Sequence, residues 1–334
     1  MKNILIFGAT GSIGIYTSVL LKQKGYNVYA VGRRKNDGGF FGDYGIPYFS
    51  VEISNKSQFS VLPQKDIYAV IHLAGAMPAH MIDYTPQLYI DSIITGTLNV
   101  LDYINKVGCK MIIFSQSIAD ILYRFGSLDP IDDDVERKFP LNTDHSIYSI
   151  SKNAAVNVIE HYHEKYGISR FILRLPTIYC YHPDPYYYVD GEKRWLGYRY
   201  IIEQAIKGEQ LEIWGDPNST KEMVYIKDLV QLIELCIESD KPGGVYNVGC
   251  GAPISIENQI RMIAEVFNSE KKSSIIYCPQ KRSSPQFVLS IEKAQRELGY
   301  KPAFGFKQLL LDYKNYLEKE PYAKIMGLRK DFMK

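Results

Sequence analysis

The chain has 334 residues, of which 46% are hydrophobic and 23% are charged, and its formal net charge at pH 7 is +2. This near-neutral balance argues against nucleic acid as the main partner, because phosphate backbones are bound by strongly basic surfaces. The length and the hydrophobic fraction exclude a disordered chain and allow one large domain, or a large and a small one. We therefore expect a globular protein with a small-molecule ligand.

No segment of the sequence indicates export or insertion into a membrane. The N-terminal stretch MKNILIFGATGSIGIYTSVLLK has a short apolar run broken by three glycines, unlike a secretory signal. No stretch approaches the roughly 20 apolar residues of a membrane span. The five scattered cysteines show no CxxC spacing, which predicts neither a disulfide framework nor a metal site. We expect a cytoplasmic protein that does not contact a membrane.

Short apolar runs alternate with amphipathic runs along the first half of the chain. The patterns predict, in chain order, a strand at 3–8, a helix at 12–25, strands at 27–32, 46–53 and 68–75, a helix around 88–104, a strand at 110–115, a helix at 148–166 and a strand at 170–176. Such alternation is typical of an α/β fold in which helices cover both faces of a parallel sheet.

The character of the sequence changes after Pro176. The segment YCYHPDPYYYVDGEKRW is crowded with Tyr and Pro, and the later predicted strands are short and widely separated. We therefore expect a first domain at 1–176 and a smaller C-terminal α/β region at 177–334. The second region is expected to bind mainly the substrate, and some of its segments are expected to return to the sheet of the first domain.

A glycine-rich turn, GATGSIG, links the first predicted strand to the first predicted helix. Its GxxGxxG spacing allows a tight turn and a close approach of the backbone to a pyrophosphate, whose charge is favoured at a helix N-terminus. A turn that serves only packing is the alternative, but the flanking strand and helix favour a dinucleotide site in a Rossmann-like, doubly wound sheet. The candidate cofactor-binding residues of this turn are Gly8, Gly11, Ser12, Ile13 and Gly14.

Two adjacent arginines follow the second predicted strand. In a dinucleotide-binding unit this strand ends in an acid that binds the adenosine ribose hydroxyls, and here that position is Gly32. Arg33 and Arg34 come next, and a guanidinium group is suited to bidentate bonds with a ribose 2′-phosphate. The sequence therefore favours NADP(H), with NAD(H) still possible; the alternative is a basic loop in solvent.

A second constellation is the motif YSISK. Tyr148 and Lys152 are four residues apart, so a helix would place both side chains on one face. A nearby ammonium charge would lower the pKa of the phenol from about 10 towards neutrality and make the phenolate available as a base. Ser115 and Ser117 are expected just past the end of the fifth strand, where sheets of this kind build their sites. The alternative is two unrelated residues in a chain with 27 tyrosines.

These ordered motifs, together with HLAG after the fourth strand, resemble the extended short-chain dehydrogenase/reductase family, whose members mostly act on nucleotide-diphosphate sugars. The later segments GEQLEIWGDPNSTKEMVYIKDLV, GGVYNVGCG and SIEKAQRELGYKP continue the resemblance, which runs from residue 3 to about 318. The resemblance implies that Tyr148 is the general acid/base on a sugar hydroxyl or ketone. It implies that Lys152 lowers the pKa of this tyrosine and holds the nicotinamide ribose, and that Ser117 hydrogen-bonds the reacting oxygen.

The same resemblance assigns further residues to the cofactor and the substrate. It places Glu52 and Ile53 beside the adenine, and Leu73, Ala74 and Gly75 along the cofactor. Lys221 and Arg282 match positions that usually contact the substrate diphosphate, His182 falls near a histidine of a related epimerase/reductase, and Ser92 and Ile93 stand where many relatives have Asn. Relatives commonly dimerise through two long helices, so we expect a homodimer.

The residues after Ser117 bear on the type of reaction. Dehydratases of the family have an Asp-Glu pair there, whereas this chain has Ile118 and Ala119, so elimination is not expected. Hydride transfer at a sugar carbon, most simply C4, remains. The arginines favour a 4-keto-sugar reductase that uses NADPH and releases its cofactor after each turnover. One alternative is a C4 epimerase that retains its cofactor. Another is a binding protein that senses dinucleotides without turnover.

Overall fold

The computed structural model describes residues 1–334 except 79–83, 144, 190, 269, 284 and 334. Its centre is a seven-stranded sheet in the order β13-β6-β5-β4-β1-β2-β3, and every neighbouring pair is parallel. The strands are β1 (Asn3–Phe7), β2 (Asn27–Gly32), β3 (Tyr48–Ser50), β4 (Ala69–His72), β5 (Met111–Ser117), β6 (Ser169–Leu175) and β13 (Gly243–Asn247).

Helices cover both faces of this sheet. Alternate residues of a strand point to opposite faces, and in β1 the side chains of Ile4 and Ile6 join the core under α1 (Ser12–Gln23) and α7 (Ile226–Glu238). Leu5 and Phe7 join a second core under α4 (Gly96–Lys106) and α5 (Ser146–Tyr166). Burial on both faces is the mark of a doubly wound sheet, and the predicted fold class is confirmed.

Helices and turns around this core are short. They are α2 (Phe40–Asp43), the 3-10 turn η1 (Lys56–Val61), α3 (Pro86–Tyr89), the π-helical turn η3 (Ile90–Thr95), and the 3-10 turns η4 (Ile118–Asp120) and η5 (Leu122–Arg124). The predicted strand at 46–53 is only three residues long, because the chain leaves the sheet into a turn in which Asn55 N donates to Glu52 O at 2.9 Å.

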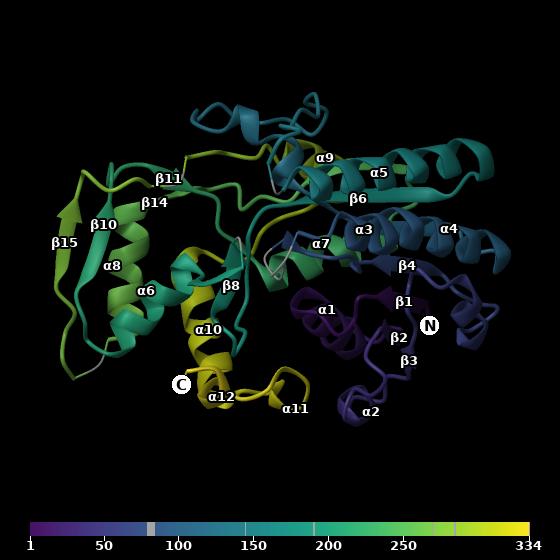
Figure 1. Cartoon of the computed structure of the whole chain (residues 1–334), viewed down its shortest axis with the longest axis horizontal. Helices are drawn as coiled ribbons and strands as arrows, with labels where there is room; N and C mark the ends of the chain where they lie inside the picture. Colours follow the sequence, from purple (N-terminus) through teal and green to yellow (C-terminus); the bar gives the residue numbers. More distant parts are fainter. Residues whose placement is uncertain (79–83, 144, 190, 269, 284, 334) are drawn as a thin grey trace.

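The C-terminal half builds a smaller region at the left of Figure 1. Its parallel pair β10 (Leu211–Trp214) and β15 (Ile275–Cys278) lies beside α6 (Gly197–Ile206) and α8 (Ile256–Val266). Three further two-stranded pairs are β7 (Ile178–Tyr179) with β12 (Val224–Tyr225), β8 (Tyr186–Val189) with β9 (Glu192–Trp195), and β11 (Thr220–Lys221) with β14 (Ile254–Ser255). The remaining helices are α9 (Glu292–Leu298), α10 (Phe306–Lys319), α11 (Ala323–Met326) and α12 (Arg329–Phe332).

Besides α7, β13 and α11 of the C-terminal half lie against the first domain. β13 pairs with β6 and extends the central sheet. Near the C-terminus, Lys324 Nζ forms an ion pair with Asp43 at 2.5 Å, so α11 lies beside α2 (Figure 1). The boundary between 1–176 and 177–334 stays a prediction. Within the described part of the chain, no helix combines the length and the apolar character needed to cross a membrane.

Candidate active site

The glycine turn between β1 and α1 is shaped by close backbone contacts. Gly8 has φ +82°, and a Cβ atom there would lie 2.7 Å from the backbone N of Ala74. A Cβ atom on Gly14 would lie 2.1 Å from Gly8 O. Only glycine fits these two positions, so the turn can press against the segment that follows β4, which is the segment of Leu73, Ala74 and Gly75 predicted along the cofactor.

The N-terminus of α1 lies directly after this turn. α1 begins at Ser12 with Gly11 as its N-cap, and no hydrogen bond from a side chain caps it. The backbone N–H groups of the first turn, including those of Ser12 and Ile13, are therefore oriented as a site for an anion. The residues present fit a dinucleotide, which would supply the hydride acceptor and donor of a redox reaction.

The end of β2 shows why no acid stands there. A Cβ atom on Gly32 would lie 2.8 Å from Thr10 Cγ2, 2.9 Å from Thr10 Oγ1 and 3.1 Å from the Tyr48 hydroxyl. The space that an acidic side chain would need is filled by two hydroxyl-bearing side chains. Tyr48 also donates a hydrogen bond of 2.6 Å to Arg34 O. The sequence patterns gave no signal for Thr10 and Tyr48, because the contact joins three segments of the fold.

The two arginines beside this position differ in their surroundings. Both are exposed. Arg34 donates a hydrogen bond of 2.8 Å from Nη1 to Ile325 O in α11, so its guanidinium group is tied to the C-terminal segment. Arg33 has no hydrogen bond or ion pair to another described side chain. Arg33 is therefore the arginine whose donors are open to a ligand.

The predicted adenine contacts lie directly after β3. Val51 N donates to Gly32 O at 2.9 Å, which places Glu52 next to the end of β2. Ile53 is buried, and its backbone oxygen accepts a hydrogen bond of 3.0 Å from Asn99 Nδ2. The strand order therefore brings both residues to the edge of the sheet at which the glycine turn lies.

The helix α5 places Tyr148 and Lys152 on one buried face, 6% and 4% exposed. Lys152 Nζ donates a hydrogen bond of 2.6 Å to Ser115 O and lies 6.0 Å from the centre of the Tyr148 ring. Ser117 is the last residue of β5, and its Oγ accepts a hydrogen bond of 3.1 Å from Ala119 N. The three predicted catalytic side chains therefore gather at the carboxyl end of β5.

The expected lowering of the Tyr148 pKa is wrong for the protein without ligand. Burial raises the pKa of this phenol to about 12, and the nearby Ser117 hydroxyl opposes the rise only in part. Burial also lowers the pKa of Lys152 to about 7, so the lysine is charged in only part of the molecules at neutral pH. Desolvation outweighs the i, i+4 pairing, and Tyr148 is a phenol poised to donate a proton.

Met77, which contacts Tyr148, had no sequence signal, whereas the sequence singles out Ser92 as a departure from the family pattern. The Tyr148 hydroxyl lies 3.7 Å from Met77 Sδ, in the segment after β4. Ser92, which stands where many relatives have Asn, donates to Leu88 O at 2.6 Å and accepts from Ala76 N at 3.0 Å. This bond lies in the π-helical turn η3, so a short hydroxyl supplies a polar contact at this bend.

Besides Ser117, the predicted substrate residues lie after residue 176. Lys221 is half-buried on β11, burial lowers its pKa, and it has no hydrogen bond or ion pair to another described side chain. Arg282 is exposed in the segment after β15. His182 accepts a hydrogen bond of 3.1 Å from Asp184 N and lines a small cavity with Tyr181, Arg199 and Tyr313. The structure therefore places His182 between α6 and α10.

The family follows from a match over most of the chain. The model of the NAD dependent epimerase/dehydratase family matches residues 4–249. The chain belongs to this family. The predicted membership of the extended short-chain dehydrogenase/reductase family is confirmed, and with it the prediction of an enzyme.

Curated relatives extend the similarity to nearly the whole chain. UDP-glucose 4-epimerase 4 of Oryza sativa subsp. japonica is 25% identical over 96% of this chain and 92% of its own length. UDP-glucuronate 4-epimerase 4 of Arabidopsis thaliana is 23% identical over 94% of this chain and 75% of its own length.

Solved structures agree in fold. UDP-glucose 4-epimerase of Thermotoga maritima, crystallised with UDP-glucose, has a TM-score of 0.76 at 23% identity and covers 96% of this chain and 99% of its own. UDP-glucuronic acid 4-epimerase of Bacillus cereus, in complex with NAD, has a TM-score of 0.71 at 21% identity and covers 96% and 100%.

Proposed function

We propose that this protein is a C4 epimerase of a nucleotide-diphosphate sugar, with Tyr148 as the general acid/base. The observation that carries the proposal is the gathering of Ser117, Tyr148 and Lys152 at the carboxyl end of β5, without an acidic pair after Ser117. The names of the relatives support C4 as the reacting carbon and a UDP-sugar as the first substrate to test.

The reaction needs a proton and a hydride to leave the sugar and then return. A bound dinucleotide would supply the acceptor and the donor of the C4 hydride. Tyr148 would take the proton of the C4 hydroxyl once its own phenol has lost its proton, and it would return that proton to the C4 oxygen after the sugar has turned its other face. Ser117 would donate a hydrogen bond to that oxygen in both half-reactions, and Lys152 would hold the nicotinamide ribose.

Reduction of a 4-keto sugar is the second candidate, and the protonation state of Tyr148 favours it. With a pKa raised to about 12, the phenol at neutral pH is ready to donate a proton to a ketone oxygen but has to lose one before it can accept. The absence of an acid at Gly32 also favours a reductase. Without a carboxylate there the site can accept the 2′-phosphate of NADPH, and reductases that release their cofactor commonly use NADPH.

The cofactor proposal rests on the end of β2. We propose that the protein accepts NADP(H), with the ribose 2′-phosphate beside Arg33 and the hydroxyl of Thr10. A carboxylate there would repel the phosphate, and Gly32 has none. NAD(H) is the competing cofactor, because the family description and the neighbour from Bacillus cereus both name NAD.

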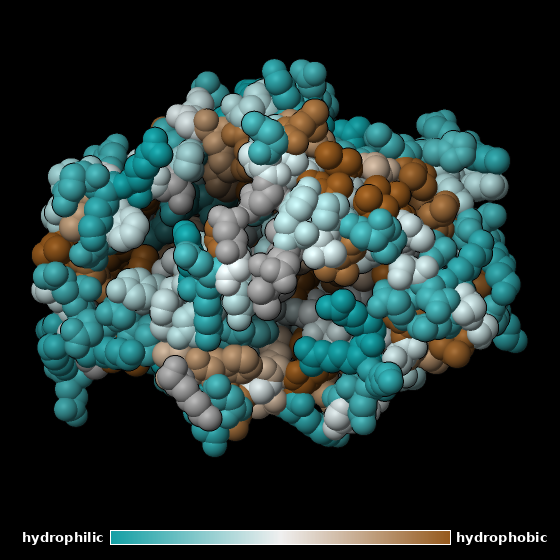
Figure 2. All heavy atoms as spheres, in the orientation of Figure 1, coloured by the Kyte–Doolittle hydropathy of each residue, from teal (hydrophilic) through white to brown (hydrophobic). Residues whose placement is uncertain are grey.

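We further propose a homodimer through α4 and α5. Figure 2 shows apolar side chains gathered over this side of the molecule, and Leu88, Leu98 and Ile150 are 41%, 41% and 38% exposed. A second copy would cover them. Sedimentation equilibrium of the wild type and of Leu98→Glu tests this: the dimer should dissociate in the variant, and a monomeric wild type would overturn the proposal.

The two reactions are distinguished by whether they consume reduced cofactor. An epimerase should convert UDP-glucose or UDP-glucuronate to the C4 epimer, detected by chromatography, without net change in absorbance of the reduced nicotinamide. A reductase should oxidise one NADPH for each molecule of a UDP-4-keto sugar. Tyr148→Phe should lower either rate about 10²- to 10⁴-fold. Near-wild-type turnover in this variant would remove Tyr148 from its role.

A further inference from the structure

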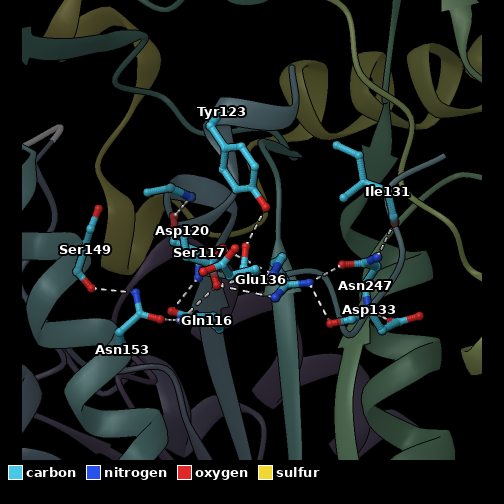
Figure 3. A network of polar contacts seen from close by, with 12 residues as sticks. Gln116, Ser117, Asp120, Tyr123, Ile131, Asp133, Glu136, Ser149, Asn153 and Asn247 are labelled. Carbon is cyan, nitrogen blue, oxygen red and sulfur yellow. Dashed lines mark hydrogen bonds and ion pairs between the residues drawn. The ribbon is translucent and has the colours of Figure 1, made fainter. Parts of the chain in front are cut away.

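A network of buried polar side chains lies directly behind Ser117, at the carboxyl ends of three neighbouring strands (Figure 3). Gln116 comes from β5, Arg174 from β6 and Asn247 from β13, and all three are at most 3% exposed. Asp120, 1% exposed, comes from the η4 turn that follows Ser117. The network therefore joins the turn after Ser117 to the buried strands β5, β6 and β13 of the sheet.

Arg174 is the centre of this network. Its Nε lies 3.2 Å from Asp120 Oδ1, and its Nη1 donates to Asn247 Oδ1 at 2.9 Å and to Asp133 O at 3.1 Å. A buried ion pair adds little to stability compared with apolar side chains of the same volume, because both charges lose their hydration. What the pair does provide is one fixed arrangement of the groups that it joins.

Gln116 connects this ion pair to Ser117. Its side-chain Oε1 accepts a hydrogen bond of 2.9 Å from Ser117 N, and its Nε2 lies 3.4 Å from Asp120 Oδ2. The same Nε2 lies 3.4 Å from Oδ1 of Asn153, a residue of α5. One amide group therefore contacts the backbone of Ser117, the ion pair and the helix that carries the other two candidate catalytic residues.

The contact to α5 lies close to those residues. Asn153 follows Lys152 directly, and Asn153 Nδ2 donates a hydrogen bond of 2.8 Å to Ser149 O, the residue after Tyr148. A shift of the Gln116 side chain would therefore displace both Ser117 and the segment of α5 that carries Tyr148 and Lys152.

The orientation of the Ser117 hydroxyl depends on the same turn. Ser117 Oγ accepts a hydrogen bond from Ala119 N, which leaves the hydroxyl hydrogen to donate towards Tyr148 or a substrate oxygen. Asp120 ends this turn, and its carboxylate is held by Arg174. If the carboxylate moved, the turn would move and the hydroxyl would turn with it.

We infer that Gln116 and Asp120 are positioning residues that fix Ser117 relative to Tyr148 for proton transfer at the reacting oxygen. The inference rests on the proposed roles of Ser117 and Tyr148 and adds to them the buried groups that hold the geometry. Burial is the main cause of the raised pKa of the Tyr148 phenol, and the negative charge of Asp120 adds to it. Asp120 thereby helps to keep the proton on the phenol.

The first test is Gln116→Met, which keeps the length of the side chain and removes both its donor and its acceptor. A displacement of about 1 Å in a catalytic group can lower a rate about 10²-fold. We expect kcat to fall about 10- to 100-fold, while KM for the sugar nucleotide and Kd for the reduced cofactor stay within about twofold of wild type. Unchanged kcat would overturn the inference, as would equal losses in kcat, KM and cofactor binding.

Gln116→Glu gives a second readout that a purely structural role would not move. A protonated glutamic acid keeps one donor for Asp120 and one acceptor for Ser117 N, whereas the ionised form loses the donor and repels Asp120. The ratio of its kcat to that of wild type should therefore fall as the pH rises, and the ratio for Gln116→Met should stay flat. A flat ratio for both variants contradicts the inference.

The matched control is Tyr123→Phe, which removes an exposed hydrogen bond of 2.9 Å to Glu136 O in the same segment. Its kcat should stay within about twofold of wild type, and a loss as large as that of Gln116→Met would show that any loosening of the segment suffices. Tyr148→Phe serves as the reference. Loss of turnover in Tyr148→Phe with none in Gln116→Met overturns only this inference, whereas full turnover in Tyr148→Phe overturns the proposed function itself.

Discussion

The Lys152 ammonium group donates a hydrogen bond of 2.6 Å to the backbone oxygen of Ser115, and no carboxylate of a described residue forms an ion pair with it. The Phe114 ring, 4.6 Å from Nζ, covers another side of the charge. A carbonyl dipole and an aromatic face replace only part of the lost hydration, which is why burial lowers the pKa of Lys152 to about 7. The buried charge of Lys152 therefore lowers the free energy of unfolding of the protein.

Stability should therefore depend on pH through Lys152. The folded pKa lies below the unfolded value, so between about pH 7 and pH 10 the unfolded chain binds more protons and the free energy of unfolding rises with pH. Lys152→Met removes this term. The variant should be more stable than wild type at pH 6 to 7, and the difference should shrink towards pH 9.5, as measured by urea unfolding without cofactor. A difference independent of pH would mean that the buried lysine titrates normally.

The glycine turn offers a matched pair of substitutions. Gly14→Ala places a Cβ atom 2.1 Å from Gly8 O and should lower both the unfolding temperature and cofactor affinity. Gly11→Ala places its Cβ atom 3.4 Å from the same oxygen, at the helix N-cap, where alanine fits the backbone. It should lower the unfolding temperature much less than Gly14→Ala does and lose cofactor affinity, because the methyl group stands where the pyrophosphate approaches. Wild-type affinity in Gly11→Ala would place the pyrophosphate elsewhere.

The two arginines after β2 should contribute unequally to cofactor choice. Arg33→Ser should weaken NADPH binding about 10- to 100-fold and leave NADH binding nearly unchanged, because a charged hydrogen bond is worth about 1.5 to 3 kcal/mol. Arg34→Ser should have a smaller effect, because its Nη1 is bound to Ile325 O. The ratio of the two dissociation constants, measured by fluorescence titration at one salt concentration, decides the matter. If wild type binds NADH as tightly as NADPH, the NADP(H) proposal is wrong.

Lys221 and Arg282 should differ as contacts for the substrate diphosphate. Lys221→Met removes a half-buried charge without an ion pair to another described residue, so it should raise the unfolding temperature slightly while weakening UDP binding. Arg282→Met should weaken UDP binding by about 1.5 to 3 kcal/mol in calorimetric titration if a charged hydrogen bond is lost, without a change in stability. Unaltered UDP affinity in either variant would make that residue a surface charge.

The first domain was predictable because its signals are local. The periodicity of 27–32 and 148–166 predicted β2 and α5 closely, since each pattern is set by neighbours along the chain. The spacing of Gly8 and Gly14 likewise predicted a tight turn, and no residue other than glycine fits these two positions. The i, i+4 spacing placed Tyr148 and Lys152 on one face of a helix for the same reason.

The tertiary structure decided what depends on contacts between distant segments. The pKa values of Tyr148 and Lys152 follow from burial, which spacing cannot show, and burial reversed the expected effect on the phenol. Arg34 is bound by a carbonyl 291 residues away in the sequence, and Thr10 and Tyr48 fill the space beside Gly32. The network behind Ser117 likewise takes its members from three strands and a turn. The sequence determined the helices and turns because the contacts that form them are local. Packing determined the pKa values of the site and the positions of its side chains, because it buries together residues that are far apart in the sequence.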